Sequence, residues 1–183
     1  MDGYPYSLAP EFDDGGGVKT PFEKWWPRVK DRFSNVPENV ARYWLHEHWG
    51  RSPYRYLKSS VYTFRRVAWP SAQLFEFRST FDDFDPACNG CIAKGKQLVT
   101  IKTIGKLYPT AEYMLEHRNF PAPIIVLDNH DDHANNDYPQ LWKVPDGFVL
   151  IEGHTRFNIA TYLQTIGRLN ETVDVWLMNK ISH

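Results

Sequence analysis

The stretch that decides the fold is FVLIEGHTRFNIATYLQTIG, residues 148–167. Its first four residues, 148–151, are all apolar and predict a buried strand. From residue 154 onward the apolar side chains recur at helical spacing, which predicts a helix that ends at Gly167. Gly153 lies between the two elements, where it permits a backbone turn that other residues disfavour. The stretch therefore predicts a strand that runs through a tight loop into a helix.

The residues at this junction, Glu152-Gly153-His154-Thr155-Arg156, are of types that suit an anion. The first turn of a helix presents free N–H groups and the positive end of the helix dipole. Thr155 adds a hydroxyl, and Arg156 adds a forked cation that matches phosphate oxygens. Glu152, at the end of the strand, could bind Mg²⁺ or act as a base. In a plainer interpretation Gly153 is only a turn, Arg156 a surface residue and Glu152 a partner of the helix dipole.

The residues around this stretch predict a small mixed α/β unit over 97–183. Apolar runs and turn residues mark each expected element. The expected elements are strands over 98–104, 124–127 and 173–177, a helix over 109–118, and a polar loop over 128–146.

The first 96 residues divide into a flexible arm over 1–19, rich in Gly, Asp and Pro, and a helical, aromatic-rich accessory region over 20–96. Thr20, Pro21 and Glu23 predict a capping box at the start of a first helix. A second helix is expected over about 37–49. Residues 51–82 mix arginine with aromatics and are expected to be irregular, with a short strand over 74–77, and 82–95 is expected to be a loop. For the aromatic and arginine mixture, core packing ranks first, a protein interface second and nucleic-acid stacking third.

The order of elements resembles a known superfamily. The chain is similar in this order to the N-terminal domain of ParB-type partition proteins: an apolar strand over 124–127 that follows a proline, a second strand, and a Gly-x-x-Arg sequence that opens a helix. The order is also similar to sulfiredoxins and to the free-serine kinases that share their fold. The likeness covers roughly residues 97–180. It implies an α+β fold, a small mixed sheet with helices of ParB/sulfiredoxin type, here with an N-terminal aromatic-rich helical extension.

The resemblance also implies roles for individual residues. Gly153 and Arg156 match the glycine and the final arginine of the family's phosphate loop. His154 and Thr155 fill the two variable positions, which are typically Glu and Arg in partition proteins, while sulfiredoxins carry their catalytic cysteine where His154 stands. The kinase-like relatives have an acid, Gly, His, His, Arg order, which Glu152 to Arg156 matches most closely. Peroxiredoxin repair and a CTP-dependent clamp are therefore not expected.

These residues predict a nucleotide-phosphate-binding enzyme that uses ATP or CTP with Mg²⁺, for NTP hydrolysis or phosphoryl transfer. Gly153, Thr155 and Arg156 would bind the nucleotide, and Glu152 and His154 would be catalytic. One alternative is a protein-interaction or inhibitory factor that acts through the N-terminal aromatic region. A second is a metal-dependent nuclease, a common description of the family, in which Asp128 would be a metal ligand near Glu152.

Composition restricts the partners. The formal net charge is −1, so duplex DNA binding has no support from an overall basic excess. Neither a secretory leader nor an apolar run long enough to span a membrane is found in the sequence, which predicts a cytoplasmic protein with no membrane partner. Cys88 and Cys91 have the spacing of half a zinc site or of a redox pair, and two ordinary thiols in a turn is the preferred interpretation.

Overall fold

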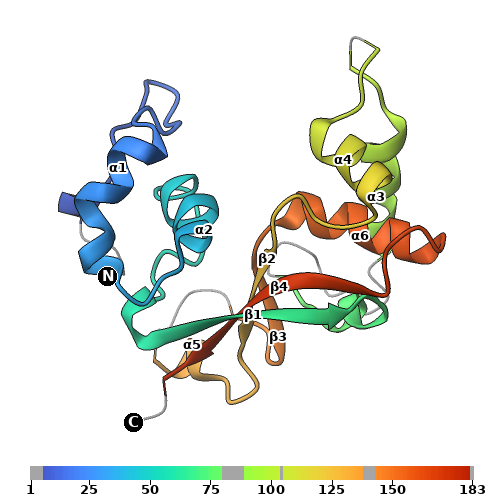
Figure 1. The fold of residues 1–183 in the computed structure, drawn as a ribbon. Coiled ribbons are helices and arrows are strands. Elements are labelled where there is room, and N and C mark those ends of the chain that lie inside the picture. The colour runs from blue at the N-terminus through green and yellow to red at the C-terminus, as the bar shows by residue number, and fades with distance from the viewer. Residues whose placement is uncertain (1–5, 80–88, 104, 138–142, 182–183) are drawn as a thin grey trace.

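A computed structural model describes residues 6–79, 89–103, 105–137 and 143–181, and over these residues the fold is α+β, as expected. A four-stranded mixed sheet lies at its centre (Figure 1), with the strands β1 (Tyr62–Pro70), β2 (Ile124–Asp128), β3 (Phe148–Glu152) and β4 (Thr172–Lys180). The strand order is β1-β4-β2-β3. β4 pairs antiparallel with β1 and parallel with β2, and β2 pairs antiparallel with β3.

Each face of the sheet is covered by a different group of helices, which Figure 1 shows as two separate groups. Ile125 and Leu127 of β2 belong to a core cluster with the N-terminal helices, whereas Ile124 and Val126 belong to a cluster with the later helices. This division follows from the alternation of side chains along a strand. The near-continuous apolar run of β2 is therefore explained by burial on both faces.

The N-terminal group contains α1 (Phe22–Val29), α2 (Glu38–Val40) and a π-helical segment over Ala41–His46 that continues α2. Its aromatic side chains are mainly core: Trp25, Trp44 and Tyr54 are each at most 1% exposed. Short 3₁₀ helices lie at Tyr6–Leu8, Lys30–Phe33, Ser59–Val61 and Ser71–Glu76. The structure thus confirms the aromatic-rich helical extension. In the mixture of arginine and aromatics that begins at residue 51, Tyr54, Tyr56 and Tyr62 are buried, in agreement with the first-ranked interpretation as core.

The later group contains α3 (Asn89–Thr100), α4 (Pro109–His117) and α6 (His154–Thr165), and the single-turn α5 (His133–Asn136) lies in the loop after β2. The expected helix over 109–118, the strands over 124–127, 148–151 and 173–177, and the helix from 154 are confirmed. Gly167, with φ +65°, follows the end of α6 as expected.

Four expectations about local structure are wrong. Residues 98–100 are the end of α3 and not the start of a strand. Residues 62–70 form β1 and not irregular structure, and residues 74–76 are 3₁₀ helix and not strand. Residues 89–95, expected as loop, belong to α3, so the boundary expected between residues 96 and 97 lies inside one helix. The sheet also takes β1 from the segment 20–96.

The start of the first helix also differs from the expectation. Pro21 is the N-cap of α1, without a side-chain capping bond, so the capping box does not form. The hydroxyl of Thr20 instead accepts a hydrogen bond from the N–H of Glu11, at 3.1 Å. That bond, with the Lys19 N–H to Glu11 carbonyl bond of 2.8 Å, ties the described part of the N-terminal arm to the first helix.

Candidate functional site

The loop between β3 and α6 requires glycine at its centre. Gly153 is the N-cap of α6 and has φ +100°. A Cβ atom at this position would lie 2.6 Å from Cγ2 of Ile124, a fully buried side chain. The first hydrogen bond of the helix runs from the N–H of Phe157 to the carbonyl of Gly153, at 2.8 Å. The N–H groups of residues 154–156 precede that bond, and a helix start of this kind suits an anion.

Arg156 lies beneath this loop, in the protein interior, and is only 8% exposed. Its Nη1 donates to the carbonyl of Ala122 at 3.2 Å, and its Nη2 forms an ion pair with Oε2 of Glu152. The guanidinium carbon lies 5.3 Å from the ring centre of Tyr43. The plainer interpretation of Arg156 as a surface residue is therefore wrong, and its charge is largely balanced by Glu152.

Glu152 lies between two basic side chains, Arg156 and His48, which come from distant parts of the chain. Its Oε2 atom contacts Arg156, and its Oε1 atom lies 3.5 Å from Nε2 of His48. The side chain of Glu152 is 15% exposed. The hydrogen bond to Glu152 is the main cause that raises the pKa of His48 above its ordinary value, and it outweighs the opposing effect of partial burial.

A pocket of 570 Å³ opens above the loop. Residues 151–156 form its floor, residues 43–53 of the N-terminal group form one wall, and Tyr108, Thr110, Pro121 and Ala122 complete it. The volume lies within the range of small-molecule sites in proteins, about 300–1,000 Å³. All five residues of the expected site, Glu152 to Arg156, line this pocket. The lining has two arginines, Arg51 and Arg156, and two glutamates, Glu47 and Glu152.

The part of the pocket lining that comes from residues 43–53 could not be predicted from the sequence. The helix expected over about 37–49 includes residues 46–48, but a helix end alone does not indicate a site. His48, Tyr43 and Arg51 reach the pocket because the N-terminal group packs on the sheet. No local pattern near His48 identifies Glu152, far along the chain, as its partner.

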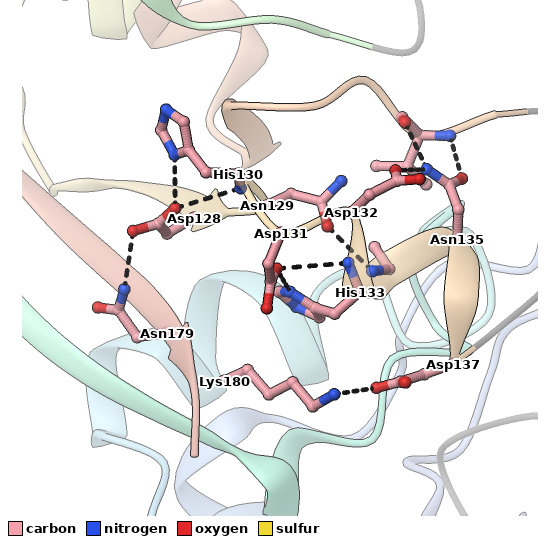
Figure 2. Close-up of polar contacts among 12 residues, drawn as sticks. Asp128, Asn129, His130, Asp131, Asp132, His133, Asn135, Asp137, Asn179 and Lys180 are labelled. Atoms are coloured by element: carbon pink, nitrogen blue, oxygen red, sulfur yellow. Dashed lines mark hydrogen bonds and ion pairs between the residues drawn. The ribbon is translucent and has the colours of Figure 1, made fainter. Parts of the chain in front are cut away.

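Asp128, the expected metal ligand, lies away from Glu152. In the antiparallel pairing of β2 and β3, Asp128 is opposite Phe148, whereas Glu152 is opposite Ile125, so the two carboxylates lie at opposite ends of the strand pair. Figure 2 shows Asp128 between two neighbours: Nδ1 of His130 at 2.7 Å and Nδ2 of Asn179, which donates at 3.1 Å. Within the described ranges, no group of three or more His, Cys, Asp or Glu side chains could hold a metal ion.

The rest of the polar loop after β2 forms bonds that fix its own backbone (Figure 2). The amide of Asn129 donates to the carbonyl of Pro145 and accepts from the N–H of Ala134, and Asn135 bonds to both backbone groups of Val144. Asp137 pairs with Lys180 at the end of β4, at 2.6 Å. These contacts favour the interpretation of the loop as a structural connection.

The two cysteines, which could form half a zinc site or a redox pair, lie in or next to α3 in the sequence. Cys91 is buried on α3, and Cys88 lies outside the described residues. In the part of the chain that the structure describes, no helix is long and apolar enough to cross a membrane.

Comparison with known proteins adds no relative. No family model, no curated protein and no solved structure matches this chain. The function is therefore inferred from the sequence and from the geometry of the pocket.

Proposed function

We propose that this protein is a nucleotide-phosphate-binding enzyme, which hydrolyses a nucleoside triphosphate, ATP or CTP, or transfers its phosphoryl group. The observation that carries the proposal is the 570 Å³ pocket whose floor is the glycine loop at the N-terminus of α6. A helix N-terminus next to a cavity of that size provides the phosphate-binding element and room for a nucleoside. The same loop supports the proposal that residues 97–180 are related to ParB-type proteins and sulfiredoxins.

Because Arg156 is largely buried and paired with Glu152, the direct phosphate contacts would come mainly from other groups. The N–H groups of His154 and Thr155 and the hydroxyl of Thr155 would hold the phosphate, since both side chains are partly exposed in the pocket. Arg156 would keep Glu152 and the loop in position from below. His154 would assist as a proton donor, as the sequence predicts, and Glu152, whose oxygens face His48 and Arg156, would act through these partners.

The pocket does not contain a ready-made Mg²⁺ site. Both oxygens of Glu152 already face basic partners, Arg156 and His48, and Asp128 lies at the other end of β2. Mg²⁺ would thus enter on the nucleotide's phosphates, in a manner common for this ion. The two arginines of the pocket lining are matched by two glutamates, so a Mg²⁺ ion bound to the phosphates would also offset the negative charge of the phosphates. No step of the proposal depends on a protein-bound metal.

The two alternatives have weaker support. A nuclease centre built from Asp128 and Glu152 requires the two carboxylates to converge, and the strand register separates them. An interaction surface on the N-terminal aromatic region requires exposed aromatics, and most of those described there are buried in the core. Membrane binding has no support from the described helices, and a cytoplasmic location is proposed from the sequence alone.

The test is a thermal-shift series with ATP, CTP, GTP and ADP, each with and without Mg²⁺. A ligand at about a hundred times its dissociation constant adds roughly 2.7 kcal/mol of stability. The variant Thr155→Val removes the hydroxyl at the start of α6, and Thr165→Val is the matched control at the end of the same helix. We expect one triphosphate to raise the melting temperature of the wild type and of the control, with a much smaller effect in Thr155→Val. No shift with any nucleotide, or equal shifts in both variants, would refute the proposal.

A further inference from the structure

His48 is placed in the pocket by an unusual piece of helix. The segment Ala41–His46 is π-helical, and the N–H of Glu47 bonds to the carbonyl of Arg42, five residues back, at 3.2 Å. π-Helical turns are rare and are frequent at functional sites. Tyr43 in this segment and Glu47 and His48 directly after it line the pocket. Tyr43 lies near Arg156, and His48 lies beside Glu152.

The contact with Glu152 fixes the chemical state of the imidazole ring. A carboxylate that faces Nε2 favours the tautomer with the proton on Nε2, because that nitrogen then donates to the carboxylate. Nδ1 of the neutral ring is left as a proton acceptor. The side chain is 38% exposed and lines the pocket, so solvent or a bound substrate can reach the ring. A carboxylate that orients a histidine in this way is a common arrangement of general bases.

We propose that His48 is the proton acceptor for the attacking oxygen in the phosphoryl transfer of the proposed function, on which this inference rests. The oxygen of water, or of an acceptor hydroxyl, gives its proton to Nδ1 of His48 and forms a bond to the γ-phosphorus. The bond from the γ-phosphorus to the oxygen that bridges it to the β-phosphate breaks, and its electron pair stays on the departing nucleoside diphosphate. Glu152 stabilises the imidazolium that results, while Arg156 holds Glu152 in place.

This role sets the direction of the pH dependence. Glu152, and more weakly Glu47, raise the pKa of His48, while burial and Arg156 lower it. Arg51 and His154 line the same pocket. Because a protonated ring cannot accept a proton, turnover should fall at acidic pH with a midpoint above 6.5, the ordinary value for histidine.

The experiment compares nucleotide binding and phosphate release in the wild type, in His48→Gln and His48→Ala, and in His117→Gln. His117 is the control because it lies on α4, stacked on Tyr113 and outside the pocket lining. We expect His48→Gln to bind the nucleotide like the wild type but to lose about 10²–10⁴ in kcat, the usual range for a general base. The acidic limb of the pH–rate profile should disappear, and added imidazole should restore part of the turnover of His48→Ala.

The outcomes separate this inference from the proposed function. If nucleotide binds and His48→Gln turns over like His117→Gln, His48 is not the base and the proposed function stands. If kcat of His48→Gln falls but its pH–rate profile keeps the acidic limb, and added imidazole does not restore turnover of His48→Ala, then His48 has a structural role. This outcome also overturns the inference. If the wild type binds no nucleotide, both proposals fail.

Discussion

Replacing Gly153 by alanine measures how tightly the loop fits against the sheet. Two costs apply in the folded state. A residue with a Cβ pays about 1–2 kcal/mol for a left-handed backbone conformation, and Gly153 has φ +100°. The new methyl would also lie 2.6 Å from Cγ2 of Ile124 and 3.1 Å from Nη2 of Arg156. Overpacking of a closed interior typically costs about 1–3 kcal/mol. We expect Gly153→Ala to lower the free energy of unfolding by about 2–5 kcal/mol in total.

Gly167→Ala provides the matched control. Gly167 also has positive φ, +65°, but a Cβ there would meet nothing within 4 Å. It therefore pays only the backbone cost, about 1–2 kcal/mol, and both variants share the small effect of alanine on the unfolded chain. Urea denaturation of the three proteins gives the comparison. If Gly153→Ala costs no more than Gly167→Ala, the close contact between the loop and β2 is not present in solution, and the proposed site loses its basis.

Three further predictions concern Arg156, Glu152 and His48. Arg156→Ala leaves Glu152 poorly compensated in a largely buried position, and it should lower the free energy of unfolding by about 3–5 kcal/mol. The control Arg66→Ala removes the exposed ion pair with Asp174 and should cost less than about 1 kcal/mol. Similar costs for the two variants in denaturation would contradict the buried pairing of Arg156 with Glu152. Glu152→Gln should lower the pKa of His48, followed by NMR titration of the ring, because the main cause that raises it is removed; an unchanged pKa would exclude the contact. Because the pKa of His48 is raised in the folded state, the stability that His48 contributes should be fully present below about pH 6.5 and should be lost as pH rises through the folded pKa. The difference in free energy of unfolding between wild type and His48→Gln should therefore shrink from about pH 5.5 to about pH 8.5. A difference that grows with pH would contradict this sign.

Much of the later fold could be predicted because its signals are local. Residues 124–127 and 148–151 are apolar runs that only a buried strand explains well, and the glycine at 153 marks the turn between strand and helix. The loop residues 152–156, which line the pocket, could be singled out for the same reason, while their roles stay a prediction. The role of Arg156 was less predictable, because burial depends on Ala122 and Tyr43, which come from other segments.

The elements that sequence reasoning missed depend on distant partners. Leu98 to Thr100 resemble the start of a strand, but they continue α3, which packs on α6 so closely that a Cβ at Gly95 would lie 1.9 Å from the carbonyl oxygen of Asn158. β1 mixes arginine and aromatics without a clear alternation, and it becomes a strand by pairing with β4. His48 gains its importance in the same way, through Glu152.

The pairing of β1 with β4 also has a consequence for the order in which the molecule folds. Thr63 bonds to Asn179 across 116 residues of sequence, so the sheet can be completed only when most of the chain is available. Contacts of such long sequence separation slow folding, because the loop entropy is lost before the contact stabilises the chain. Until then the aromatics of the N-terminal group lack the sheet face on which they pack, among them Trp25, Trp44 and Trp49. During synthesis these aromatics precede the strands that cover them, so part of their apolar surface stays exposed until β2, β3 and β4 have been made.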